Sequence, residues 1–155
     1  MDTLLEKEFR LEQLLPLIQE TLNQGKSVTF SPRGVSMLPM LRQGKDTVTL
    51  APIERELKKY DLPLYRRDNG AFVLHRIVKS GETYTCIGDN QYDLEYGVRR
   101  DQMIGVVTSF SREGRKIDVT NFGYQLYCRL RHWSRPVRKI ILRAKRYVKR
   151  LLINK

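Results

Sequence analysis

The sequence lacks any long hydrophobic run, and this absence argues against one class of protein. Hydrophobic residues make up 41% of the 155 positions, yet no apolar stretch approaches the roughly 18–20 residues that a membrane-spanning helix needs. The first ten residues, MDTLLEKEFR, are acidic and contain no hydrophobic segment of the secretory type. We therefore expect a cytoplasmic protein.

Cysteine and histidine are also scarce. Cys86 and Cys128 are the two cysteines, and neither belongs to a Cys-x-x-Cys or Cys/His pattern. Neither a disulfide framework nor a zinc site is indicated, and we expect no metal and no cofactor. Cys86 lies in a strand-like run and is most simply a buried apolar residue.

Acidic residues are missing from the C-terminal part of the chain. From Tyr127 to Lys155 there are eleven Lys/Arg and no Asp/Glu, whereas residues 1–126 hold 18 basic and 17 acidic residues. The net charge of +12 therefore belongs almost entirely to this last segment. A protein that wraps nucleic acid more often carries a basic face on its folded body, so the distribution disfavours nucleic acid as the partner.

The hydrophobic pattern divides the chain into three segments. Residues 1–25 predict an N-terminal helical segment, in which Pro16 starts a second helix or kinks one. Residues 26–120 consist of short runs rich in Val, Ile, Thr and aromatics, separated by turn residues, and predict an antiparallel β domain. In residues 121–155 the helical period returns. The expected fold class is mainly β, with helices at both ends.

The stretch GVSMLPML, residues 34–41, places Ser36 in a turn after a Pro-Arg-Gly sequence. A turn serine is commonly inert, because its hydroxyl is a weak nucleophile without a base nearby. In AFVLHRIV the strand alternation places Val73, His75 and Ile77 on one face. Partial desolvation there favours the neutral imidazole that a general base requires. Arg76 cannot act as the base, since its guanidinium stays protonated.

Three carboxylates follow in the segment IGDNQYDLEYGV. Asp89, Asp93 and Glu95 could each orient an imidazole and stabilise its protonated form. Asp89 also fits a turn, since Asp side chains hydrogen-bond to their own backbone. Spacing alone leaves the choice among the three open.

These segments, in this order, resemble the LexA-like and type I signal peptidase superfamily of serine peptidases. Ser36-Met37-Leu38-Pro39 matches the S-M-x-P motif of the nucleophile, and LRQGKDTVTLAP resembles the turn and strand that follow it. DLPLYRRDNGAFVLHRIV, with a predicted hairpin at Asn69-Gly70, resembles the strand pair that carries the base. His75-Arg76-Ile77 matches the histidine version found in endoplasmic-reticulum-type signal peptidases, and IGDN and MIGVV resemble later segments.

The resemblance implies a signal-peptidase-like β domain with Ser36 as nucleophile and His75 as base. Asp89 occupies the G-D-N position, and Asp93 and Glu95 compete for the charge-relay role. Gly34 stands where signal peptidases carry a serine, so backbone amides would stabilise the oxyanion, while Met37 and Pro39 could line the substrate groove. The expected function is a serine endopeptidase acting on an extended peptide, such as a leader. The alternative is a non-catalytic peptide- or membrane-binding module of the same fold.

The C-terminal segment predicts a basic amphipathic helix over residues 136–153. Eight apolar residues share one face: Val137, Ile140, Ile141, Ala144, Tyr147, Val148, Leu151 and Leu152. The cations around them are Arg138, Lys139, Arg143, Lys145, Arg146, Lys149 and Arg150. We expect this helix to bind an anionic membrane surface from the cytoplasmic side, without spanning it. Docking of the same face on the β domain or on a partner is the alternative.

Overall fold

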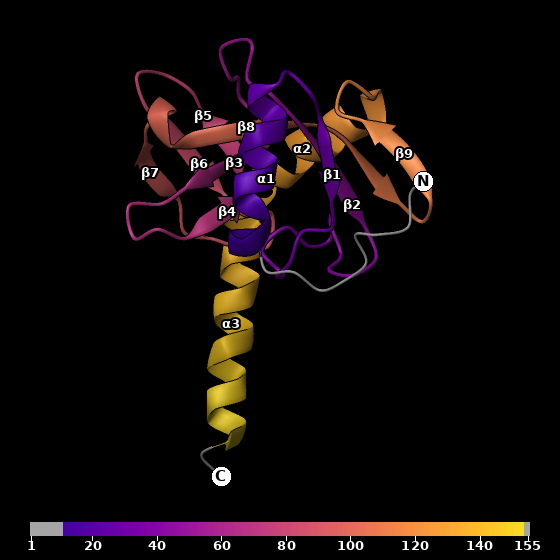
Figure 1. The fold of residues 1–155 in the computed structure, drawn as a ribbon. Helices are drawn as coiled ribbons and strands as arrows, with labels where there is room; N and C mark the ends of the chain where they lie inside the picture. The colour runs from indigo at the N-terminus through magenta and orange to yellow at the C-terminus, as the bar shows by residue number, and fades with distance from the viewer. Residues whose placement is uncertain (1–10, 154–155) are drawn as a thin grey trace.

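The computed structural model describes residues 11–153 and has a mixed α/β architecture built on two antiparallel sheets (Figure 1). The expectation of antiparallel sheets is confirmed, but "mainly β" is only roughly right, because helices and strands hold similar numbers of residues. The elements in chain order are α1 (Leu11–Asn23), β1 (Val28–Phe30), β2 (Thr47–Ala51), β3 (Pro63–Arg66), β4 (Phe72–Leu74), β5 (Arg76–Lys79), β6 (Tyr84–Ile87), β7 (Glu95–Val98), the 3-10 helix η1 (Arg100–Gln102), β8 (Met103–Arg112), β9 (Arg115–Asp118), α2 (Phe122–Trp133) and α3 (Arg135–Ile153).

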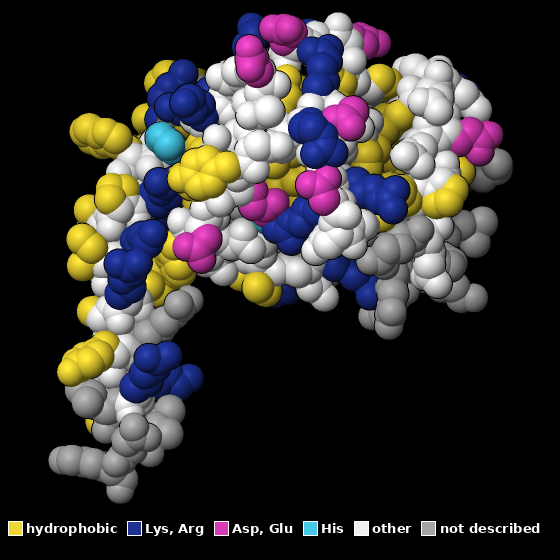
Figure 2. Space-filling view, turned by 90° about the vertical axis from the view of Figure 1, so that its left-hand side faces the viewer, with side chains coloured by type: hydrophobic (Ala, Val, Ile, Leu, Met, Phe, Trp, Pro, Cys, Tyr) yellow, Lys and Arg dark blue, Asp and Glu magenta, His cyan; other side chains and the backbone are white. Residues whose placement is uncertain are grey.

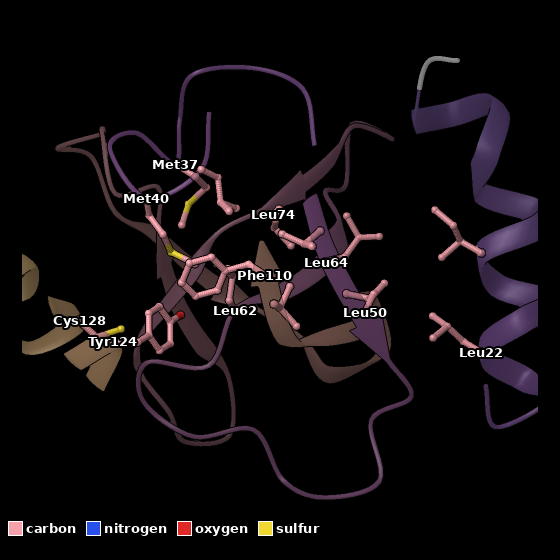
Figure 3. Packing of buried hydrophobic residues seen from close by; sticks show 14 residues of the cluster. Leu22, Met37, Met40, Leu50, Leu62, Leu64, Leu74, Phe110, Tyr124 and Cys128 are labelled. Atoms are coloured by element: carbon pink, nitrogen blue, oxygen red, sulfur yellow. The ribbon is translucent and has the colours of Figure 1, made fainter. Parts of the chain in front are cut away.

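The N-terminal helix α1 covers one face of the larger sheet. Ile18 and Leu22 are buried one turn apart, and Figure 3 shows Leu22 pointing toward Leu50 of β2. Pro16 lies inside α1 rather than at a helix start. The helix stops before Gly25, whose φ of 73° suits a residue without a side chain. Residues 1–10 of the expected helical segment lie outside the described residues.

The larger sheet has the strand order β1-β2-β8-β3-β4, with β9 also paired to β8, and the smaller sheet has the order β5-β6-β7. The predicted hairpin is present between β3 and β4, where Tyr65 pairs with Val73. Gly70 at its tip has φ 87°, and the Asn69 side chain accepts a hydrogen bond from the Ala71 amide. This turn chemistry is what the Asn-Gly pair supplies.

The segment AFVLHRIV forms two strands rather than one. β4 ends at Leu74 in the larger sheet and β5 begins at Arg76 in the smaller sheet, so His75 lies at the step between the sheets. His75, Arg76 and Ile77 are all buried, instead of alternating between two environments. The step separates two apolar clusters: the larger, shown in Figure 3, lies among the larger sheet, α1 and α2, and the smaller surrounds Ile77 and Tyr65.

The two C-terminal helices differ in how they pack. α2 begins at Asn121, whose side chain accepts a hydrogen bond from the Tyr124 amide, and it buries Tyr124 and Cys128 against the larger sheet. α3 instead extends away from the body as an arm (Figure 1). Among residues 11–153 there is no helix with the length and apolar character needed to cross a bilayer.

Candidate active site

Ser36 lies in a half-buried turn between β1 and β2 that is held by the loop after β6. The Ser36 carbonyl accepts a hydrogen bond from the Asn90 amide at 2.7 Å, and the Asn90 side chain donates to the Val35 carbonyl at 3.1 Å. A Cβ atom placed on Gly88 would lie 2.7 Å from the Ser36 carbonyl oxygen. A glycine is therefore needed for this close approach, which joins the S-M-x-P and G-D-N segments in space.

His75 is the partner of Glu95. The distance from His75 Nδ1 to Glu95 Oε1 is 2.9 Å, and the imidazole side chain is only 2% exposed. Glu95 also accepts hydrogen bonds from Tyr65 Oη and from Arg67 Nε, each at 2.9 Å. Because the carboxylate accepts, the proton of a neutral imidazole sits on Nδ1, which leaves the lone pair on Nε2.

The electrostatics keep this pair in the state that base catalysis needs. Burial lowers the pKa of His75 below its ordinary value, and the carboxylate of Glu95 only partly offsets this effect. Burial alone would raise the pKa of Glu95, but hydrogen bonds from Arg67 and Tyr65 outweigh it and hold that pKa low. At neutral pH the imidazole is therefore uncharged beside an ionised carboxylate.

Asp89 is bonded to Arg76 rather than to His75. Arg76 Nε and Nη2 donate to the two Asp89 oxygens at 2.8 Å each, and both side chains are 2% exposed. Tyr127 Oη donates to the same carboxylate at 2.9 Å. Burial alone would lower the pKa of Arg76, but Asp89 holds it well above its ordinary value. The Asp89 carboxylate is therefore a structural counter-ion in this geometry.

Asp93 is exposed, and the contacts of the described residues include none between it and His75. Among the three carboxylates that the sequence left open, Glu95 is thus the one at the imidazole, and neither Asp89 nor Asp93 is. Tyr65 and Arg67, which fix Glu95, were not singled out. Both lie in the hairpin segment quoted for the base, where polar residues ordinarily indicate a solvent-facing edge.

The segments that carry Ser36 and His75 are connected through the loop after β6. The Asp89 side chain binds Arg76, the neighbour of His75, and the next residue in the loop, Asn90, binds the Ser36 carbonyl. Across residues 11–153, the hydrogen bonds include none between Ser36 Oγ and the imidazole. Catalytic hydrogen bonds are commonly long in ligand-free sites and tighten with substrate.

A cavity of about 120 Å³ lies beside Ser36. Gly34 and Met37 line it as the sequence suggested, together with apolar residues from α1, β3 and β4. Pro39 is not part of this lining: it is exposed, and its carbonyl accepts a hydrogen bond from Arg112 at 3.1 Å. The cavity is large enough for an aliphatic side chain, and its lining is mostly apolar.

The cations assigned to membrane binding are not equivalent. Arg138 is turned toward the body and donates to the Asp89 carbonyl at 3.1 Å and to the Arg131 carbonyl at 2.8 Å. Burial, assisted by Arg131, lowers its pKa. The other six also lie on α3: Lys139 is half-exposed, and Arg143, Lys145, Lys149 and Arg150 are exposed, while the side chain of Arg146 lies outside the described residues.

No group of three or more His, Cys, Asp and Glu side chains within residues 11–153 is arranged to hold a metal ion. Comparisons with known protein families, with curated protein sequences and with solved structures found no match for this chain.

Proposed function

We propose that the protein is a serine endopeptidase in which Ser36 is the nucleophile, His75 the general base and Glu95 the positioning carboxylate. The observation that carries the proposal is the buried, neutral imidazole of His75, whose Nδ1 lies 2.9 Å from Glu95. The loop after β6 connects this region to the Ser36 turn, because it binds both Arg76 and the Ser36 carbonyl. Such a base–carboxylate pair recurs in serine hydrolases on unrelated folds. The resemblance to the LexA-like and signal peptidase superfamily supports the roles of Ser36 and His75.

In the proposed reaction Ser36 Oγ attacks the scissile carbonyl carbon while its proton passes to His75 Nε2. Glu95 stabilises the imidazolium that forms. The imidazolium then gives the proton to the leaving amine as the C–N bond breaks, which leaves an acyl-enzyme. Water attacks the ester while His75 takes one of its protons, and the imidazolium returns that proton to Ser36 Oγ as the C–Oγ bond breaks and the carboxylic acid product leaves. An apolar substrate side chain would enter the cavity beside Ser36.

Labelling with a fluorophosphonate tests the assignment, because the reagent forms a covalent bond with an activated serine. We expect Ser36 to be labelled, Ser36→Ala to abolish labelling, and His75→Gln to slow it by about 10²–10⁴-fold. Ser31→Ala is the matched control: Ser31 lines the same cavity, but its hydroxyl donates to the Asp46 carbonyl at 3.0 Å. Labelling that persists in Ser36→Ala would overturn the assignment.

The second candidate is a non-catalytic peptide-binding module. The missing hydrogen bond between Ser36 Oγ and His75 among the described contacts favours it. This alternative predicts that no variant is labelled, and that Ser36→Ala and His75→Gln bind a peptide from a library as tightly as the unaltered chain does.

We also propose that α3 attaches the protein to the inner face of a membrane. Its exposed residues include Val137, Ile140, Tyr147 and Val148, each more than half exposed. Figure 2 shows hydrophobic side chains along one margin of the arm, with Lys and Arg beside them. Burial of the apolar margin and attraction of the cations to anionic lipid would act together.

A further inference from the structure

The packed helix α2 carries an exposed apolar face of its own. Phe122 and Trp133 are 82% and 83% exposed, and Leu126 and Leu130 are 45% and 55% exposed. Steps of four, four and three residues place these side chains on one side of the helix. Tyr124 and Cys128, on the other side, are buried in the core. α2 therefore packs on the body with one face and presents large apolar side chains with the opposite face.

This face is continuous with the apolar face of α3. Across the junction the Ser134 amide donates to the Leu130 carbonyl at 2.9 Å, and the Arg138 amide donates to the Ser134 carbonyl at 3.0 Å, so a single residue, Ser134, separates the two helices. Steps of three and four residues lead from Trp133 to Val137 and onward along α3. We define the stripe as Phe122, Leu126, Leu130, Trp133, Val137, Ile140, Ile141, Ala144, Tyr147, Val148 and Leu152. Within each of the two helices, at 100° per residue, these positions stay within less than half of the helix circumference.

The charges around the stripe indicate which kind of partner could bind it. From Val119 to the end of the chain there are eleven Lys/Arg and no Asp/Glu. A second copy docked on the stripe would bring two such cation sets together, and like charges at an interface oppose association. An anionic bilayer offers hydrocarbon to the stripe and negative headgroups to the cations. Tryptophan is moreover enriched at bilayer interfaces, where its ring spans apolar and polar layers.

We propose that α2 and α3 form one bilayer-binding surface, and that the α2 half lays the body itself on an anionic membrane. The inference extends the membrane attachment proposed for α3, and it does not depend on the peptidase chemistry. The inference also specifies how far the candidate active site would lie from the membrane. Arg131, on the body side of α2, donates to the Asp89 carbonyl at 2.7 Å and to the Leu38 carbonyl at 3.3 Å. The Ser36 turn is thus separated from the lipid by about one helix diameter, roughly 10 Å.

Trp133 is the single tryptophan of the chain and reports directly on the α2 half. The unaltered full chain is mixed with vesicles of phosphatidylglycerol and phosphatidylcholine, or of phosphatidylcholine alone. We expect the Trp133 emission to shift to the blue and to be quenched by brominated lipid with the anionic vesicles, and far less with the neutral ones. The Trp133→Phe variant supplies the blank.

A variant pair tests the surface independently. The double variant Phe122→Ser, Leu126→Ser should weaken partition into anionic vesicles by about tenfold or more, because two apolar side chains no longer leave water. Tyr96→Ser is the matched control, since Tyr96 is 74% exposed on β7, outside the stripe, and its loss should not change partition. Far-ultraviolet circular dichroism verifies that each variant is folded.

The outcomes separate the proposals. If the chain pellets with anionic vesicles while the Trp133 emission stays unchanged, α3 binds alone and the inference about α2 is wrong. If it neither pellets nor shifts, both membrane proposals are wrong, whereas fluorophosphonate labelling of Ser36 still decides the peptidase proposal. A blue shift that grows with protein concentration without vesicles would assign the stripe to a second copy and overturn the lipid proposal.

Discussion

At the scale of single residues, Ser36 and His75 could be singled out from the sequence, but the carboxylate beside His75 could not be chosen. The choice depends on Arg76. A fully buried arginine is rare and is not expected from a strand-like run. Once buried it requires a counter-ion, and Asp89 supplies it at 2.8 Å. Glu95 reaches the imidazole because it begins β7, whose pairing with β6 sets Glu95 opposite Cys86. Neither the burial of Arg76 nor the pairing of β7 with β6 can be predicted from the spacing of residues in the sequence.

The first prediction at this scale concerns pH. If His75 is the base, labelling of Ser36 should fall as pH decreases, with a midpoint below the ordinary histidine pKa of about 6.5, because burial lowers the pKa of His75. The unfolded chain then binds the proton more tightly than the folded chain does, so this residue's contribution to the free energy of unfolding also decreases as pH falls below about 6.5. Labelling rates and urea unfolding between about pH 4 and 8 measure both.

Two variants sharpen the pH experiment. Glu95→Gln removes a charge that raises the pKa of His75, so the midpoint should move further down while the labelling slows. His132→Gln is the control: His132 lies in α2 against Tyr60, and the labelling profile should not change. A profile that is flat over this range, or a midpoint above 6.5, would contradict the role given to the buried imidazole.

At the scale of elements, the close contact between the Ser36 turn and the loop after β6 gives the second prediction. In Gly88→Ala the new Cβ would lie 2.7 Å from a backbone oxygen, so the backbone must shift. We expect labelling to slow at least about tenfold and unfolding to become easier by about 1–3 kcal/mol. In Gly81→Ala the nearest atom, the Thr83 carbonyl oxygen, is 3.8 Å away, and both quantities should stay almost unchanged. Equal behaviour of the two variants would argue against a tight loop contact.

Helical periodicity predicted the α3 arm, and turn chemistry predicted the β3–β4 hairpin. The single strand expected for AFVLHRIV was wrong, because the chain passes from one sheet to the other at His75. The packing of α2 could not be predicted, since its sequence offers apolar residues on two faces. Periodicity does not tell which of the two meets the body. That choice follows from Tyr124 and Cys128, which contact Arg76 at 2.8 and 2.9 Å.

At the scale of the whole molecule, the third prediction separates α2 from the arm. A chain that ends at Asn121 lacks Tyr124 and Cys128, which leaves Arg76 without two of its partners and opens the core. A buried donor left without its partner costs about 1–3 kcal/mol, and the opened core adds to this loss, against the roughly 5–15 kcal/mol that stabilises a domain. We expect no cooperative thermal unfolding of this chain by circular dichroism.

The comparison is a chain that ends at Lys139. It keeps α2 and the Arg138 contacts to the Asp89 and Arg131 carbonyls, and loses most of the arm. It should unfold cooperatively near the midpoint of the full chain. If the chain ending at Asn121 melted equally well, α2 would be an appendage and the segment from 121 onward would be a true tail.

The hydrogen-bond partners of Arg76 also limit the order in which parts of the chain can reach their final positions. Its partners come from Met40, Tyr60, Asp89, Tyr124 and Cys128, so they are spread over the sequence from position 40 to position 128. A ribosome releases the chain from its N-terminus, and α2 therefore emerges after every strand of the two sheets. Until it does, the guanidinium cannot be buried without leaving donors unpaired. His75, the preceding residue in the chain, thus reaches its final setting only after α2 has been synthesised and has packed.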